Sequence, residues 1–261
     1  MPFPECEHVL FKNNPIDNVV CQLRFSPIYS IDSEPPAKFQ ELIITDFPEA
    51  MDVVYEGVFN ISFEQNQSLP VSPNANYGFK TSDEKWKVNL TRTSLSLICD
   101  KDYPDWESFY KKFNIILNAF SQCYPSIKIF TRVGLQYTNV FVRSRLGLDG
   151  ESWSKLIEDA FSGPLSTEIA SSVVNINNTY EINLADNNGK AVIMSTLVTD
   201  PNDQNQIPCF LLSNDFFTTT KTTFEEINSV LTFLHLRATR FIMFATKKDL
   251  QEAMMKDKVE L

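Results

Sequence analysis

The sequence predicts an α+β fold of two related halves, each a mainly antiparallel sheet packed by a long amphipathic helix. Three observations support this prediction. Several segments alternate apolar and polar residues with the period of two that is typical of half-buried strands. Two long segments carry Phe-rich apolar stripes with helical spacing. The order of strands followed by a long helix occurs twice along the 261 residues.

The first half opens with a strand at residues 18–25, in which alternate residues are apolar. A helix is expected next, with Ser33 as its cap and Pro48 at its end. Its apolar face consists of Phe39, Leu42, Ile43 and Phe47. Alternation then predicts strands over residues 52–63, 77–82, 85–91 and 94–99.

The clearest helix of this half follows Asp105, a residue type that favours the N-cap. Its apolar residues recur at helical spacing, at Trp106, Phe109, Tyr110, Phe113, Ile116, Leu117 and Phe120. Residues 127–142 then form a long strand with apolar residues on both faces. We therefore expect this strand to lie in the centre of a sheet.

The second half begins after Gly147 and Gly150 with a short helix capped by Ser152. Strands are expected over residues 171–184, 190–199 and 207–215, and the Asn188-Gly189 pair predicts a hairpin between the first two. Two capping boxes follow. The one at residues 223–226 predicts a helix that ends near residue 244, and the one at residues 246–249 predicts a short terminal helix.

These elements place a boundary between an N-terminal half, residues 1–148, and a C-terminal half, residues 149–261. No Gly/Ser-rich or Pro-rich linker separates the halves. One continuous domain is therefore the alternative.

The composition favours a cytoplasmic protein. The five Cys are odd in number, form no C-x-x-C pair and mostly lie in apolar surroundings, so we expect buried free thiols. The sequence contains no signal peptide and no apolar run that would span a membrane. The net charge of −10 disfavours direct binding of nucleic acid. Solubility explains this acidity, and a surface that docks onto a basic partner is the alternative. The expected partner is another protein.

The sequence contains no catalytic motif. It has two His, His8 and His235, and no H-E-x-x-H, Walker A, G-x-S-x-G or G-x-G-x-x-G pattern. We therefore predict no catalytic residue, no cofactor and no metal site. An acidic cluster near Lys101 could hold a divalent ion in a hydrolase, but acids are also favoured at a helix N-terminus. This cluster consists of Asp100, Asp102, Asp105 and Glu107.

Arg24 and Arg132 are the leading candidates for a binding site. Each lies inside a predicted strand, opposite most of its apolar row. An internal ion pair or an exposed sheet face would explain them, because a buried Arg requires a partner. The functional interpretation is a polar concavity to which Gln136, Tyr137 and Asn139 add hydrogen-bonding groups, suited to a nucleotide or a peptide carboxylate.

Two sequence blocks resemble a bacterial family of about this length, which is sporadically distributed and of unknown function. The blocks are Asn14-Pro15-Ile16-x-x-Val19-Val20-x-x-Leu23-Arg24-Phe25 and Arg132-Val-Gly134-Leu-Gln136-Tyr137-Thr-Asn139. The family often has a basic residue where this chain has Gln136. The scattered distribution of the family implies lateral transfer, which is common for mobile or defence-associated loci.

The resulting hypothesis is a non-enzymatic binding or accessory protein of such a locus, acting through protein–protein contacts. A sensor domain for a nucleotide-like anion is the first alternative, and a metal-dependent hydrolase or nuclease is the second.

Overall fold

A computed structural model describes residues 3–6, 9–56, 74–184, 189–199, 207–254 and 256–258. The chain forms two compact units. The first unit comprises residues 1–19, 134–220 and 225–261, and the second comprises residues 20–133 and 221–224. Helices and a large antiparallel sheet make this an α+β protein, as predicted.

The division between the units does not coincide with the expected boundary between residues 148 and 149. The chain passes from one unit to the other inside two strands, at residues 19/20 and 133/134. Strand pairing joins segments that are distant in the sequence, so a division by order along the chain cannot locate such a boundary.

In the second unit, the strands lie in the hydrogen-bonded order β3-β5-β6-β7-β2-β8, and β4 and β12 pair with β5 and β8. Their bounds are β2 Ile16–Phe25, β3 Glu49–Ala50, β4 Val54–Glu56, β5 Asn74–Lys80, β6 Trp86–Thr91, β7 Ser94–Asp100, β8 Ile129–Phe141 and β12 Thr222–Thr223. The strands predicted at residues 77–82, 85–91 and 94–99 are confirmed as β5, β6 and β7.

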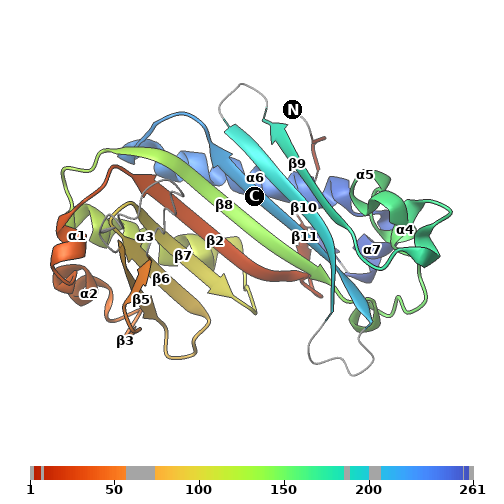
Figure 1. The fold of residues 1–261 in the computed structure, drawn as a ribbon, viewed down its shortest axis with the longest axis horizontal. Coiled ribbons are helices and arrows are strands. Elements are labelled where there is room, and N and C mark those ends of the chain that lie inside the picture. Colours follow the sequence, from red (N-terminus) through yellow and green to blue (C-terminus); the bar gives the residue numbers. More distant parts are fainter. Residues whose placement is uncertain are drawn as a thin grey trace, which may run out of the picture. The chain divides into compact units, whose positions relative to one another are not determined.

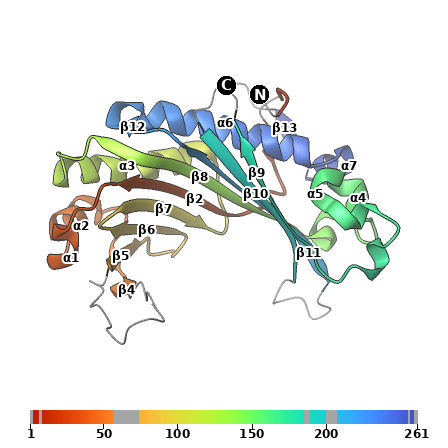
Figure 2. The same cartoon turned by 45° about the horizontal axis from the view of Figure 1, so that its top comes forward.

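Helix α3, Trp106–Cys123, covers one face of this sheet (Figures 1 and 2). The Asp105 side chain accepts a hydrogen bond of 2.6 Å from the Ser108 amide, so the predicted cap is confirmed. The helix buries five of the seven residues of its predicted apolar stripe, among them Phe109, Phe113 and Phe120, whereas Trp106 and Tyr110 are half-buried. These rings pack on the apolar row of the sheet, where Trp86 and Phe25 lie 5.8 and 4.8 Å from Phe109 and Phe120.

Two expectations for the second unit need correction. The helix expected between Ser33 and Pro48 is the shorter α2, Ala37–Ile43, which begins after Pro36 and ends before Phe47. Ser33 does not cap it, because Ser33 is the last residue of a separate one-turn helix, α1 Ser30–Ser33. Leu42 is 40% exposed and does not belong to the apolar face. Of the strand predicted at 52–63, only β4 is seen, and residues 57–63 lie outside the described residues.

In the first unit, the hydrogen-bonded order is β2-β8-β11-β10-β9. The additional strands are β9 Asn177–Asn183, β10 Gly189–Thr199 and β11 Pro208–Thr218. Neighbours β9–β10, β10–β11 and β11–β8 are antiparallel, which confirms the predicted pairing of the first two. A separate two-stranded sheet joins β1, Val9–Phe11, to β13, Lys256–Lys258.

Helix α6, Ile227–Ala245, packs on the sheet of the first unit (Figure 2). Phe241 forms the centre of this contact, with its ring 5.3, 5.4 and 6.2 Å from those of Phe3, Phe161 and Phe216. Three shorter helices complete the unit: α4 Trp153–Leu156, α5 Asp159–Ser162 and α7 Lys248–Ala253. Short 3₁₀ segments occupy Arg143–Leu146, Gly163–Ser166, Ala170–Ser172 and Phe224–Glu226.

Neither predicted capping box starts a helix in the expected way. Thr223 pairs in β12 and Phe224–Glu226 form a 3₁₀ turn, so α6 begins at Ile227. The Thr246 hydroxyl donates back to the Ile242 carbonyl, at 2.7 Å, and does not cap α7. The helix expected after Ser152 is split into α4 and α5.

No helix in the described part of the chain is long and apolar enough to cross a membrane.

Candidate functional site

The face of the second unit's sheet opposite α3 is lined mainly by polar side chains. Strand alternation sends the apolar residues of β5, β6, β7 and β2 toward α3 and the intervening residues to the opposite face. These intervening residues include Gln22, Arg24, Asn74, Asn76, Asn89, Thr91, Ser94 and Ser96. We call this surface the open face.

The open face encloses a hollow of about 490 Å³. The residues that line this hollow are Gln22, Arg24, Phe25, Asn74, Asn76, Asn89, Thr91, Thr93, Ser94, Ser96 and Thr131. All belong to the second unit. Ten of the eleven side chains are polar, Arg24 is the single charged one, and none is a carboxylate.

The strand register assembles the lining into rows. Asn76 pairs with Thr91, and Thr91 pairs with Ser94, so a carboxamide and two hydroxyl groups follow one another across three strands. Asn89 pairs with Ser96 in the next row on the same face. Side chains that oppose each other in this way lie within contact distance. The lining of the hollow therefore depends on the pairing of several strands and does not come from one strand alone.

Gln22 connects the lining residues of two strands. Its Nε2 donates to Ser96 Oγ at 3.5 Å, and its Oε1 accepts from Arg24 Nε at 2.8 Å and from Arg132 Nη1 at 3.5 Å. The neutral carboxamide thereby orients the Arg24 guanidinium group.

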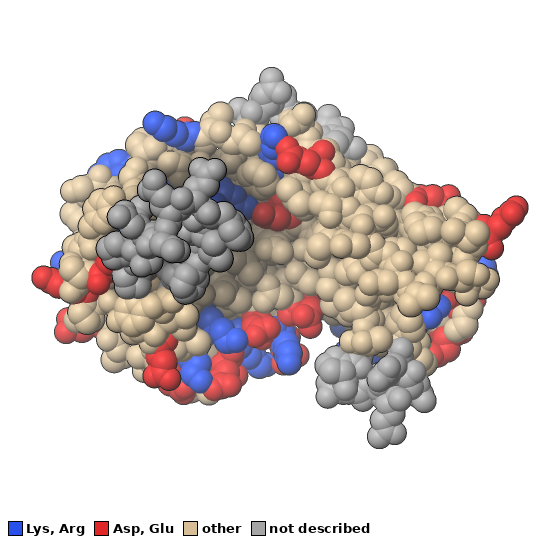
Figure 3. Space-filling view, in the orientation of Figure 1, with Lys and Arg blue, Asp and Glu red and all other residues tan. Residues whose placement is uncertain are grey.

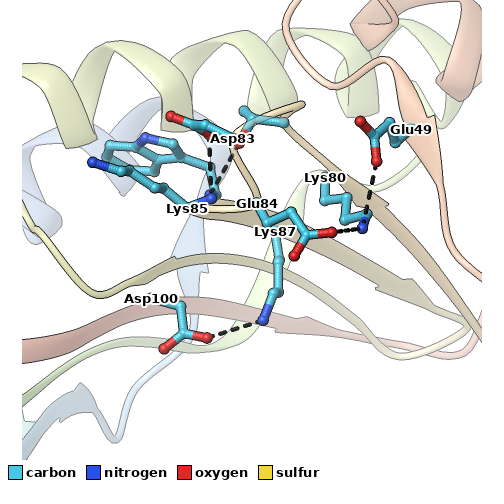
Figure 4. Close-up of polar contacts among 9 residues, drawn as sticks. Glu49, Lys80, Asp83, Glu84, Lys85, Lys87 and Asp100 are labelled. Atoms are coloured by element: carbon cyan, nitrogen blue, oxygen red, sulfur yellow. Dashed lines mark hydrogen bonds and ion pairs between the residues drawn. The ribbon is translucent and has the colours of Figure 1, made fainter.

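The lysines of β5 and β6 are already paired with carboxylates (Figure 4). Lys80 contacts Glu84 and Glu49, and Lys87 lies 2.9 Å from Asp100. In the space-filling view, basic and acidic side chains alternate along the lower margin of this face (Figure 3). This mixture of signs differs from the continuous basic surface that a nucleic-acid backbone requires.

The structure divides the five predicted binding residues between the two units. Arg24 and Arg132 lie in the second unit, and both contact Gln22, a residue that the strand pattern alone did not mark as a site residue. Gln136, Tyr137 and Asn139 belong to the first unit.

Tyr137 and Asn139 lie on the side of β8 that packs against α6. Tyr137 Oη lies 2.9 Å from His235 Nδ1 of α6, and the Asn139 side chain donates to the Leu212 carbonyl at 3.1 Å. Both residues are buried. Gln136 points to the opposite face and donates to Ser213 Oγ at 3.1 Å. The five residues therefore do not share one surface, because consecutive strand positions face opposite ways.

The acidic cluster is explained by structure. Asp100 and Asp102 pair with Lys87 and Lys85 at 2.9 and 3.0 Å, and Asp105 caps α3. Among the described residues, no group of three or more His, Cys, Asp or Glu could hold a metal ion. His8 lies outside the described residues.

Two buried thiols, those of Cys21 and Cys99, are unsuited to nucleophilic chemistry. All five Cys are free, and Cys21, Cys99 and Cys209 are buried. Burial raises the pKa of the Cys99 thiol to about 12, and it raises the pKa of the Cys21 thiol well above its usual range. A thiol with so high a pKa stays protonated at neutral pH.

A comparison with protein-family models gives no match, and a comparison with curated protein sequences also gives none. Among solved structures, the chain is similar to a duplicated taurocyamine kinase from Schistosoma mansoni, with 10% sequence identity and a TM-score of 0.33. The match covers 86% of this chain and 32% of the kinase chain. The chain thus spans about a third of the length of that structure.

Proposed function

We propose that the chain is a non-enzymatic binding protein and that the hollow of the open face holds an extended segment of a partner protein. The observation that carries this proposal is the lining of the hollow, in which ten of eleven side chains are polar and one is charged. The resemblance to a sporadically distributed bacterial family extends the proposal to an accessory role in a mobile or defence-type locus.

The chemistry of the lining suits a peptide main chain. Each peptide group offers one N–H donor and one carbonyl acceptor. The carboxamides of Gln22, Asn74, Asn76 and Asn89 each offer both functions, and the Ser and Thr hydroxyl groups do the same. Small-molecule pockets are predominantly apolar, and Phe25 is the single apolar residue in this lining.

The experiment is a selection from a displayed library of random peptides. Asn89→Trp fills the hollow with an indole ring and is expected to reduce peptide capture at least tenfold. Thr131→Trp, at an exposed lining position of β8, is expected to do the same. The matched control is Asn118→Trp on the exposed side of α3, which should capture peptides as the unmodified protein does.

Retention of full binding by both Asn89→Trp and Thr131→Trp would contradict the proposal. Equal thermal stability of the three variants verifies that each is folded.

A small anionic ligand is the second candidate, and the position of Arg24 in the lining favours it. A ligand that binds the native state raises the melting temperature by mass action. A nucleotide that raises the melting temperature, together with absence of peptide capture, would favour this candidate over a partner segment.

A further inference from the structure

The charge distribution of the hollow contrasts with that of the whole chain. The chain carries a net charge of −10, with 33 Asp and Glu, yet the lining of the hollow has one Arg and no carboxylate. An anionic group that enters the hollow therefore meets Arg24 and no carboxylate among the lining residues.

Arg24 is also held in a fixed orientation. Its Nε donates to Gln22 Oε1 at 2.8 Å, and Gln22 is in turn bonded to Ser96. The side chain is exposed, and within the described part of the chain its terminal nitrogens make no ion pair. A guanidinium group fixed through Nε presents its remaining N–H donors as a planar fork.

Other basic side chains near the hollow, unlike Arg24, are paired with carboxylates. Arg92, on the turn between β6 and β7, lies 3.0 Å from Asp32, and the lysines of β5 and β6 are paired with carboxylates of the same sheet. Internal ion pairs thus neutralise these cations, whereas the partner of Arg24 inside the protein is a neutral carboxamide.

We infer that Arg24 binds a carboxylate of the partner segment, an inference that rests on the proposed function. Arg and carboxylate form two parallel hydrogen bonds, which are stronger than those between neutral groups. The carboxylate has two possible sources, the C-terminus of the segment or an Asp or Glu side chain within it. Both have the same planar oxyanion, and the experiment distinguishes them.

The experiment uses synthetic libraries of random hexapeptides on the full chain. One library has free C-termini, a second has amidated C-termini, and a third is amidated and lacks Asp and Glu. Binding to the unmodified protein is compared with binding to Arg24→Gln and Arg24→Lys. Loss of charge-assisted hydrogen bonds is expected to weaken binding about 10- to 100-fold in Arg24→Gln, with a smaller loss in Arg24→Lys.

The third library should bind the unmodified protein as weakly as any library binds Arg24→Gln. Strong binding of the first library alone identifies the C-terminal carboxylate, and strong binding of the first two identifies a side chain. Arg145→Gln is the matched control, because Arg145 is an exposed arginine in the first unit. It should leave binding unchanged.

Two negative results have different meanings. If Arg24→Gln binds like the unmodified protein while Asn89→Trp does not, the hollow binds peptides and the role of Arg24 is refuted. If the unmodified protein binds none of the libraries, the proposed function itself fails, and this inference fails with it.

Discussion

Tyr137 and Arg24 show how far the face of a strand residue can be predicted from the sequence. Both lie in strands, and both were expected to contribute to a polar site. Arg24 stands between the buried residues Leu23 and Phe25, so alternation alone sends it to the open face. Tyr137 occupies the buried row of its own strand. The Tyr137 hydroxyl group has a hydrogen-bond partner inside the protein, His235. The spacing of residues in the sequence does not reveal this partner.

Tyr137→Phe is expected to lower the free energy of unfolding by about 1 kcal/mol, because His235 loses its hydrogen-bond partner inside the packed layer. Urea denaturation measures this change. Tyr110→Phe on α3 is the matched control and should change stability by less than about 0.5 kcal/mol, the usual range for surface changes. Equal effects of the two substitutions would show that the Tyr137–His235 bond contributes nothing specific.

Cys99 gives a prediction about pH. Burial raises the pKa of the Cys99 thiol to about 12, whereas an unfolded thiol has a pKa of about 8.5. Between these values the unfolded chain loses the proton that the native state keeps, so stability falls as the pH rises from about 9 to about 12. Between pH 8 and pH 10 the unmodified protein should lose roughly 2 kcal/mol more than Cys99→Ala. Parallel pH profiles for the two proteins would refute this prediction.

At the scale of elements, periodicity identified the central strands and α3 with bounds close to those observed. Helix starts were less predictable where other geometry competed. Asp105 caps α3, whereas Thr223, the expected cap of α6, pairs with Ile129 of β8. A capping box is a favourable local arrangement at a helix start, but its first residue can instead pair with a strand that is distant in the sequence.

Asp105→Ala is expected to destabilise the protein by about 1 kcal/mol, because the Ser108 amide loses its acceptor at the start of α3. Thermal or urea denaturation provides the measurement. Ser152→Ala is the matched control, since the Ser152 side chain makes no capping hydrogen bond to α4. A loss for Ser152→Ala as large as that for Asp105→Ala would contradict the assignment of the cap.

At the scale of the whole molecule, the hollow could not be predicted from the sequence. Its lining residues are spread from Gln22 to Thr131, and they meet because β5, β6, β7, β2 and β8 lie side by side. The sequence does contain a local indication of the polar face, within single strands. Asn, Ser and Thr occupy several of the positions between the apolar residues of three successive strands. Alternation predicts that these residues share a face, but the order of strands decides which of them meet.

The division into units shows the same limit. The order of strands and helices along the chain suggested two successive halves, whereas β2 and β8 each contribute to both units. A relationship between the two halves stays a prediction.

The central claim is that the open face of the second unit binds a partner segment. Its most direct test is nuclear magnetic resonance of the side-chain carboxamide groups during titration with a peptide selected by the unmodified protein. We expect shifts at Asn74, Asn76 and Asn89, which line the hollow, and none at Asn114 and Asn118 of α3. Saturable binding that leaves the three lining carboxamides unchanged would contradict it.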